Sequence, residues 1–416
     1  MFNYDCESIT AGAIPQYGSV AARAFTTAAG SGSLDGVKAL VIGGGIIGSA
    51  VAWRLASDGV AVTVFERGRL GQEASWAAAG LIGPQAEAHE PGVFFDLALA
   101  GKRSFDAIVE RLTAESGVDP EYDHHGVLYI AFDDATRTEL QARARWQRAA
   151  GGEVEELSPR EAFKLAPVLS EKIIFALHLP TNRRVENRKL TLAYINAAAH
   201  AGADFREGAR VDSVAVTGGR ATGLRLADGS LETGDVVINA AGAWAGDLRG
   251  LEDDRIHFYP VRGQILCFDA RPGLVLPSLF STNGILVPRR DGRLLAGSIF
   301  EEAGFNKSVT LDGMERILRA VRALVPSIAS IPFREAWAGL RPASDDLLPV
   351  LGPSPTVENV LYAGGHFRSG ILLSALTGEV IADLVKGRQP SIDLAPFSPA
   401  RFRNGTARPV KLADMI

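Results

Sequence analysis

The stretch from Val37 to Glu66 constrains the fold more than any other part of the chain. A short apolar run leads into Gly43, Gly45 and Gly48, which are spaced as G-x-G-x-x-G. A helical pattern follows, and a second apolar run ends in Glu66. This order of strand, glycine loop, helix, strand and acid is that of a dinucleotide-binding unit.

Each part of this unit has a physical task. Gly43 allows the tight turn out of the strand, Gly45 lets a pyrophosphate approach the backbone, and Gly48 lets the helix pack closely on the strand. The N-terminus of the helix then offers free N–H groups to the phosphates. Glu66 follows Gly48 by eighteen residues and is placed to accept hydrogen bonds from a ribose diol. Because an acid at this position disfavours a 2′-phosphate, NADP is not expected.

An alternative interpretation of residues 37–55 is a membrane-spanning helix, since most of these residues are apolar. Such a helix needs about 20 apolar residues and would not begin with three consecutive glycines. Arg54 and the short length also disfavour it. We therefore expect no membrane span.

The composition excludes several classes of protein. The 416 residues suffice for two domains, and 22% charged with 47% hydrophobic residues is ordinary for a globular protein. A net charge of −5 argues against a nucleic-acid-binding surface. Two cysteines, Cys6 and Cys267, cannot build a disulfide framework or a four-ligand zinc site. We expect no nucleic-acid partner, no metal and a cytoplasmic location.

Residues 1–36 are rich in Ala, Gly, Ser and Thr and lack the apolar core of a secretory signal. A transit peptide is a second possibility, but Asp5 and Glu7 count against it. We expect either a flexible N-terminal extension or a start codon assigned too early.

Strand and helix patterns alternate along the rest of the chain, which predicts an α/β fold. Residues 260–332 instead resemble a series of hairpins, with a tight turn at Asp291-Gly292, and this predicts a second, mostly antiparallel sheet. A discontinuous nucleotide-binding domain interrupted by a substrate domain is the simplest account. We expect the following division: 37–120, 181–255 and 335–390 in the nucleotide-binding domain, 121–180 and 256–334 in the substrate domain, and 391–416 as a C-terminal tail.

Five separate segments carry a resemblance to a known family. They are V-I-G-G-G-I-I-G-S-A at Val41–Ala50, A-A-A-G-L-I-G-P-Q-A-E at Ala77–Glu87, L-V-P-R-R-D-G-R-L-L-A-G-S at Leu286–Ser298, W-A-G-L-R-P at Trp337–Pro342 and A-G-G-H-F-R-S-G-I-L-L at Ala363–Leu373. Together they resemble the D-amino-acid oxidase superfamily of FAD enzymes, and most closely its glycine oxidase (ThiO-type) branch. The resemblance spans about Lys38 to Arg403. It implies a Rossmann-like FAD-binding domain of the glutathione-reductase type with an inserted α+β substrate domain.

The resemblance implies FAD rather than NAD. We expect it to be bound noncovalently, because no cysteine lies in the last third of the chain, where monomeric sarcosine oxidases form their covalent flavin link. Glu66 with Arg67 would hold the adenosine ribose, and the backbone of Val211 would meet the adenine. The N-terminus of the last helix would stabilise negative charge on the reduced ring. The residues implied to bind FAD are Gly43, Gly45, Ile46, Ile47, Gly48, Glu66, Arg67, Ala74, Ser75, Ala79, Gly80, Leu81, Val211, Gly242, His366, Phe367, Arg368, Ser369, Gly370, Ile371 and Leu372.

Arg341 matches the arginine with which this family binds the carboxylate of its substrate. A planar guanidinium can hold a carboxylate through two parallel hydrogen bonds. From residue type alone, the alternative is a surface arginine in an ion pair with Asp345 or Asp346. Arg368 matches a second arginine near the substrate and the flavin, or else it has a structural role in its turn.

Two positions depart from the glycine oxidase pattern. Ile285 stands where a tyrosine usually helps to hold the substrate, and Phe300 stands where a close relative has an active-site methionine. Both changes make the pocket more apolar, and Tyr259 is one residue that could compensate. The resemblance therefore implies glycine, sarcosine or a small D-amino acid as the substrate.

This interpretation predicts an amine oxidase. A hydride passes from the Cα of the neutral amine to flavin N5, the imine hydrolyses to ammonia and an oxo-acid (glyoxylate for glycine), and O2 is reduced to H2O2. Since the flavin performs this chemistry, no protein side chain is singled out as an acid or base. Two alternatives are a dehydrogenase that passes electrons to a quinone or carrier, and a non-catalytic flavoprotein subunit of an amine-oxidising complex. The resemblance also implies a role in thiamine thiazole synthesis and, because relatives are often homo-oligomers, a homo-oligomer.

Overall fold

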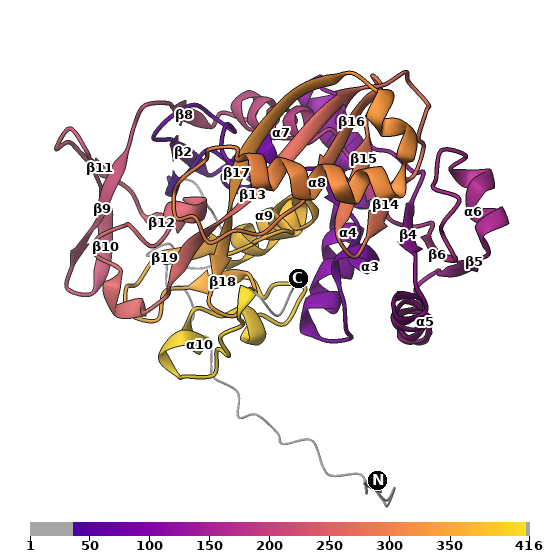
Figure 1. The fold of residues 1–416 in the computed structure, drawn as a ribbon. Coiled ribbons are helices and arrows are strands. Elements are labelled where there is room, and N and C mark those ends of the chain that lie inside the picture. Colours follow the sequence, from indigo (N-terminus) through magenta and orange to yellow (C-terminus); the bar gives the residue numbers. More distant parts are fainter. Residues whose placement is uncertain (1–35, 413–416) are drawn as a thin grey trace, which may run out of the picture.

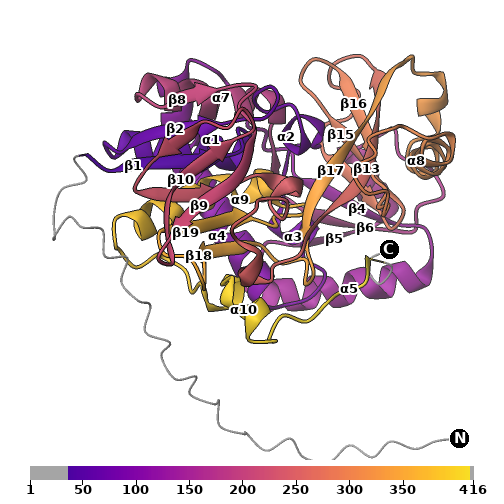
Figure 2. The same ribbon diagram turned by 90° about the vertical axis from the view of Figure 1, so that its left-hand side faces the viewer.

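The computed structural model describes residues 36–412 (Figure 1, Figure 2). The expected N-terminal extension, 1–36, lies outside the described residues except for Gly36. Two sheets organise the described chain, and they stand beside each other with β17 between the two lobes in the view of Figure 2. This arrangement confirms the expected α/β class, with a parallel sheet and a second, mostly antiparallel sheet.

The first sheet has six strands, five of which run parallel. Its outer strand β18 is antiparallel to its neighbour β19. Strand β1 lies at its centre and is almost entirely apolar, as expected for a parallel strand that is buried on both faces. In spatial order the strands are β18 (Val350–Pro353), β19 (Val360–Gly364), β12 (Val236–Asn239), β1 (Lys38–Ile42), β2 (Ala61–Phe65) and β8 (Asp204–Arg206).

Helices cover one face of this sheet and a small sheet covers the other. The four helices pack on one another and share an apolar core with the central strands; they are α1 (Ile46–Ser57), α4 (Val93–Ser116), α7 (Asn187–His200) and α9 (Gly370–Val385). On the opposite face, Leu40 and Val237 meet Val214 and Leu224 of a three-stranded sheet. That sheet consists of β9 (Val211–Thr217), β10 (Arg220–Leu226) and β11 (Leu231–Thr233).

The second large sheet has eight strands, and every neighbouring pair is antiparallel except β14 with β4. In spatial order they are β17 (Phe333–Ser344), β13 (Phe258–Asp269), β16 (Arg293–Gly297), β15 (Gly284–Pro288), β14 (Ser278–Ser281), β4 (Val127–Ala131), β6 (Phe175–Leu179) and β5 (Glu155–Leu157). Helix α8 (Leu311–Leu324) begins at the N-cap Thr310 and packs Ile317, Val321 and Leu324 against this sheet.

One expected domain boundary, at residue 335, falls inside strand β17 (Phe333–Ser344). A boundary at residue 335 would cut β17, which pairs with β13 from Ser344 back to Phe333, with one register shift at Arg334. The strand that carries Arg341 therefore belongs to the second sheet. The sequence did not reveal this, because a sequence pattern gives the period of a strand and not its partner.

Further helices and strands complete the described chain. The remaining helices are α2 (Ala74–Ala77), α3 (Pro84–Glu87), α5 (Asp134–Ala149), α6 (Pro159–Leu165) and α10 (Ala400–Arg403), and the remaining strands are β3 (Leu81–Ile82) and β7 (Arg183–Arg184). Short 3₁₀ helices are η1 (Gly242–Trp244), η2 (Glu252–Asp254), η3 (Pro326–Ser330) and η4 (Ala395–Phe397). Among the helices of residues 36–412, none is long and apolar enough to cross a membrane.

Candidate active site

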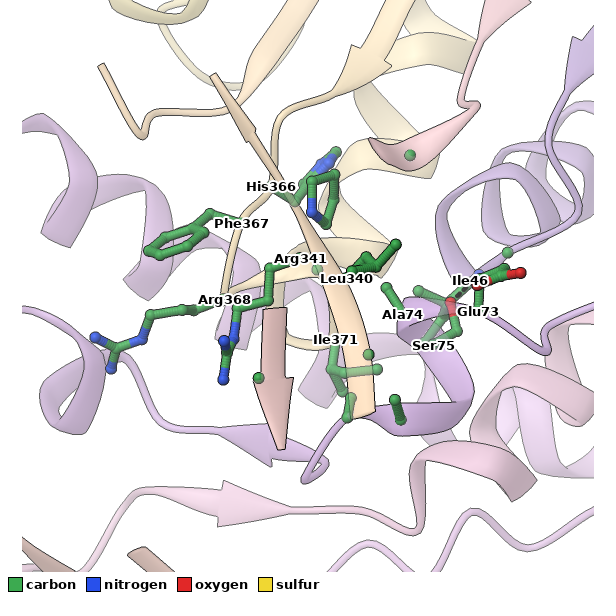
Figure 3. A pocket seen from close by; sticks show the side chains of 18 of the residues that line it. Ile46, Glu73, Ala74, Ser75, Leu340, Arg341, His366, Phe367, Arg368 and Ile371 are labelled. Carbon is green, nitrogen blue, oxygen red and sulfur yellow. Dashed lines mark hydrogen bonds between the residues drawn. The ribbon is translucent and has the colours of Figure 1, made fainter. Parts of the chain in front are cut away.

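A cavity of about 660 Å³ lies where the two sheets meet. The carboxyl ends of the parallel strands β1, β2 and β12 form one side of it, at Ile42, Phe65 and Ala240. This is the edge at which open α/β sheets bind their ligands. Figure 3 shows Ile46, Ala74 and Ser75 toward one end of the cavity and Arg341, Phe367 and Arg368 toward the other. The volume lies within the range of ligand pockets, about 300–1,000 Å³.

The glycine loop has the geometry that its spacing predicts. Gly43 has φ +101°, which only glycine adopts readily, and a Cβ there would overlap the carbonyl oxygen of Ala240. A Cβ on Gly48 would overlap the carbonyl oxygen of Gly43, so helix α1 reaches the loop this closely only with glycine. Gly43 and Gly45 line the cavity, whereas Gly48 lies behind it as a packing residue.

The start of helix α1 faces the cavity without a side-chain cap of its own. Its N-cap is Gly45, and the N–H of Ile46 donates to Ser75 Oγ at 2.9 Å. Glu66 is buried and accepts from the N–H groups of Gly44 at 2.9 Å and Gly68 at 2.8 Å. Glu66 therefore already orders the glycine loop, while it also lines the cavity.

Arg67, Trp244 and Glu73 meet at the rim of this end. The guanidinium carbon of Arg67 lies 3.4 Å from the centroid of the Trp244 ring, and an Arg67 Nη lies 3.7 Å from a Glu73 oxygen. All three residues line the cavity. Trp244 had not been singled out in the sequence, although its place directly after the small residues that end β12 was a usable signal.

The start of helix α9 forms another wall. Gly370 and Ile371 line the cavity, and the N-cap Ser369 makes no side-chain cap, so that the helix presents its N-terminus there. Complete burial lowers the pKa of His366 to about 3, and its Nε2 lies 2.9 Å from Thr377 Oγ1. His366 is therefore a neutral hydrogen-bonding side chain at neutral pH. Two expected contacts, Ser369 and Leu372, do not line the cavity; Leu372 instead points into the apolar core.

Arg341 lines the cavity from β17 with its guanidinium fixed in place. Its Nη1 donates to the carbonyl oxygen of Ile299 at 3.1 Å, and its Nη2 bonds Ser298 Oγ. The guanidinium crosses the neighbouring strand at Gly263, where a Cβ would stand 2.5 Å from Arg341 Cζ. Burial, reinforced by the charge of Arg368, lowers the pKa of Arg341 to about 10, so it remains a cation at neutral pH.

The surface ion pair considered for Arg341 is wrong. Asp345 lies 2.8 Å from His257 Nδ1, and Asp346 forms a bidentate pair with Arg401 at 2.7 and 2.9 Å. Two carboxylates, Glu87 and Glu301, lie close enough for their charges to act on Arg341. Each is already paired with another arginine: Glu87 with Arg368, and Glu301 with Arg262. Within residues 36–412, Arg341 therefore forms no ion pair.

Arg368 has a different environment. Its Nη2 lies 2.5 Å from Oε2 of Glu87, whose side chain is only 8% exposed. Phe300 lies between the two arginines, with its ring centroid 4.7 Å from Arg341 Cζ and 5.6 Å from Arg368 Cζ. Glu87 ends the motif Ala77–Glu87, and no role was predicted for it, because its partner Arg368 lies far away in the sequence and leaves no local signal.

Ile285 lies in a row of side chains along the cavity wall. It pairs across the sheet with Phe280, and Phe280 pairs with Tyr129. All three line the cavity, and Tyr129 brings a phenol to a wall that is otherwise apolar in this row. Tyr259, considered as a replacement for the missing tyrosine, stacks on His257 at 5.2 Å and does not line the cavity. His89 also lines the cavity. Tyr129 and His89 are therefore polar residues of the cavity wall for which the sequence predicted no role.

The cavity brings most of the expected residues together. Three of the proposed FAD contacts, Gly48, Ser369 and Leu372, lie outside its lining. The residues that line it as expected are Gly43, Gly45, Ile46, Ile47, Glu66, Arg67, Ala74, Ser75, Ala79, Gly80, Leu81, Val211, Gly242, Ile285, Phe300, Arg341, His366, Phe367, Arg368, Gly370 and Ile371.

The described residues fit a flavin dinucleotide. The cavity runs from a glycine loop with an open helix start, suited to a pyrophosphate, to a second helix start beside a neutral histidine. Arg341 lies at the end of the cavity opposite Ile46 and Ser75 (Figure 3). Among residues 36–412, no cluster of three or more His, Cys, Asp or Glu side chains could hold a metal ion.

Comparisons with known proteins agree with this geometry. Residues 38–384 match the model of the FAD dependent oxidoreductase (DAO) family. The chain belongs to this family and is an FAD-dependent oxidoreductase acting on CH–NH2 donors.

Among its relatives, glycine oxidase of Bacillus licheniformis is 35% identical over 349 residues, which cover 84% of this chain and 92% of the relative. The bifunctional protein ThiO/ThiG of Synechocystis sp. is 34% identical over 379 residues, or 89% of this chain and 55% of the relative. The crystal structure of glycine oxidase from Geobacillus kaustophilus superposes with a TM-score of 0.84 at 32% identity, covering 88% of this chain and 99% of the other.

Proposed function

We propose that this protein oxidatively deaminates glycine or another small amino acid, such as sarcosine or a small D-amino acid. The products are the imine, then an oxo-acid and ammonia, with O2 reduced to H2O2. Two of the relatives described above are glycine oxidases, and the cavity offers what such a reaction needs from the protein.

The single observation that carries the proposal is the state of Arg341. A cation that is largely removed from water is costly unless it is paired, and the partly buried Arg341 is fixed at the cavity wall by two hydrogen bonds without an ion-pair partner in the described chain. A substrate carboxylate completes this arrangement. The bidentate geometry would then fix the direction of the substrate Cα.

The remaining side chains support small substrates. Phe300 covers the space between the two arginines, and Ile285 and Phe280 form an apolar wall. An N-methyl group or a Cα-methyl group can pack on these surfaces, whereas a long polar side chain cannot be solvated there. When bound, FAD supplies the hydride acceptor and the reductant of O2. The protein orients the amine and excludes water, which is where most of the catalytic effect in such a reaction originates.

The proposed place in metabolism is thiamine thiazole synthesis. The relative named bifunctional protein ThiO/ThiG supports this, because the ThiO-type branch is the one whose resemblance implies a role in thiamine thiazole synthesis. In that setting the imine would be the useful product.

The test is anaerobic flavin spectroscopy of the purified holoprotein, titrated in turn with glycine, sarcosine and D-alanine. Bleaching of the flavin by one of them, followed by H2O2 on admission of air, is the expected result. Bleaching without rapid reoxidation by O2 would instead indicate a dehydrogenase that uses another acceptor. No bleaching by any of the three would reject the proposal.

A further inference from the structure

The segment after helix α10 returns to the substrate end of the cavity. Arg401 is buried and pairs with Asp346, and its carbonyl oxygen accepts from the N–H groups of Thr406 and Ala407 at 3.0 and 3.2 Å. Further on, the N–H of Val410 donates to the carbonyl oxygen of Asp345 at 2.9 Å. The expected C-terminal tail is thus held against the loop that follows β17, directly after Arg341.

Leu412, two residues after Val410, lies in a small apolar cluster and is only 6% exposed. The buried members of the cluster are Leu412, Val261, Ala343 and Phe367, and Phe300 lies against them partly buried. The cluster is separate from the larger apolar cores of both sheets. It therefore contributes little to the bulk of the fold, and its inner edge is the cavity wall, since Phe367 and Phe300 both line the cavity.

Phe367 belongs to the same apolar cluster as Leu412 and also lines the substrate end of the cavity. Its backbone has φ +47°, an uncommon conformation for a bulky residue, and its N–H donates to the carbonyl oxygen of Pro342 at 2.8 Å. Its ring centroid lies 5.9 Å from that of Phe300. Phe300 in turn lies over the guanidinium groups of Arg341 and Arg368.

We propose that Leu412 is a positioning residue that sets substrate size. It supports Phe367 from behind, and through Phe367 it holds Phe300 over the carboxylate-binding site. This inference rests on the proposed function, because it assumes that Arg341 binds the substrate carboxylate. Removing the Leu412 side chain would leave a void into which Phe367 can relax, so that Phe300 gains freedom and the substrate end widens.

The experiment compares Leu412→Ala with Val410→Ala, a change in the same segment at a residue that is 38% exposed. Two readouts are used on FAD-loaded protein: kcat and KM for glycine and for the bulkier N-ethylglycine, and the Kd of glycolate from the flavin difference spectrum. For Leu412→Ala we expect KM for glycine and Kd for glycolate to rise about tenfold, with kcat changed less than twofold. The ratio of kcat/KM for N-ethylglycine over glycine should rise by a similar factor. Val410→Ala and the volume-conserving Leu412→Met should behave as the parent.

An unchanged selectivity ratio and an unchanged glycolate Kd in loaded Leu412→Ala would overturn the proposal. If that variant does not fold, Leu412→Val provides the same comparison with a smaller void. A failure of the proposed function would look different. The parent protein would bind glycolate, but none of the amines would bleach its flavin. The glycolate Kd of parent and Leu412→Ala could still be compared, so the role of Leu412 would still be tested. A parent that binds no glycolate would overturn both the role of Arg341 and this inference.

Discussion

Arg341 and Arg368 reach the same end of one cavity, and their surroundings differ in a way that separates their roles. Arg368 is neutralised by Glu87 at 2.5 Å, so the protein itself satisfies that cation. Arg341 is held by a carbonyl oxygen and a hydroxyl, while both nearby carboxylates are committed to other arginines. An arginine that the fold holds rigidly but leaves without a counter-charge is suited to bind an anionic ligand. The comparison predicts that the two arginines contribute unequally to substrate binding.

The largest effect is expected from Arg341→Ala. Loss of a desolvated, hydrogen-bonded charge partner should raise KM for glycine on the order of 10²–10³-fold and abolish the glycolate difference spectrum. The matched control is Arg334→Ala on the same strand, where the arginine is half-exposed and paired with Asp269 at 3.0 Å. If Arg341→Ala binds glycolate as the parent does, the assigned role is wrong.

A second change moves Arg341 without removing it. In Gly263→Ala the new Cβ would stand 2.5 Å from Arg341 Cζ, so the guanidinium must shift. A displacement of this size should raise KM by about 10–100-fold. Gly246→Ala is the control, since its Cβ would meet nothing nearer than 3.5 Å. Normal FAD content with unchanged KM in Gly263→Ala would mean that the position of the guanidinium is not critical.

The local geometry of the site could be predicted from the sequence, whereas its long-range pairings could not. Gly43 and Gly48 could be assigned from the sequence, because the positive φ of Gly43 and the contact of Gly48 with the carbonyl oxygen of Gly43 are both set within a few positions. The motif was enough to assign Arg341 to the site. The sequence could not show that Arg341 has no ion-pair partner in the described chain, because this depends on which residues pair with Asp345, Asp346, Glu87 and Glu301.

The sequence also could not predict which residues face each other on neighbouring strands. Nothing local links Tyr129 to Phe280, or marks residue 335 as the interior of β17, because strand register is decided by packing between distant segments. The same holds for Leu412, which the sequence placed in a tail.

Arg368 should matter less for affinity. We expect Arg368→Met to raise KM for glycine by less than about tenfold, because the lost charge is already neutralised by Glu87. The variant should instead lose thermal stability, since the largely buried Glu87 is left without its partner. Adding Glu87→Gln should recover part of the lost Tm. If Arg368→Met raises KM as much as Arg341→Ala does, both arginines bind the substrate carboxylate, and the difference in their roles inferred from Glu87 is wrong.

The smallest effect on substrate binding is expected at His366, which contrasts with both arginines because its surroundings hold it neutral. Burial lowers its pKa from 6.5 to about 3, so between these values the unfolded chain takes up a proton that the folded chain does not. Stability must therefore fall as pH drops from 7 to 5, with a contribution from this one residue on the order of 2 kcal/mol. His366→Gln retains a hydrogen-bonding group for Thr377 but cannot titrate. Urea unfolding of both holoproteins at pH 7 and pH 5 should show a smaller loss in the variant by about that amount, with KM for glycine at pH 7 nearly unchanged. An equal loss in both proteins would mean that His366 is protonated in the folded state, placing a third cation at this end of the cavity and weakening the case that Arg341 alone anchors the carboxylate.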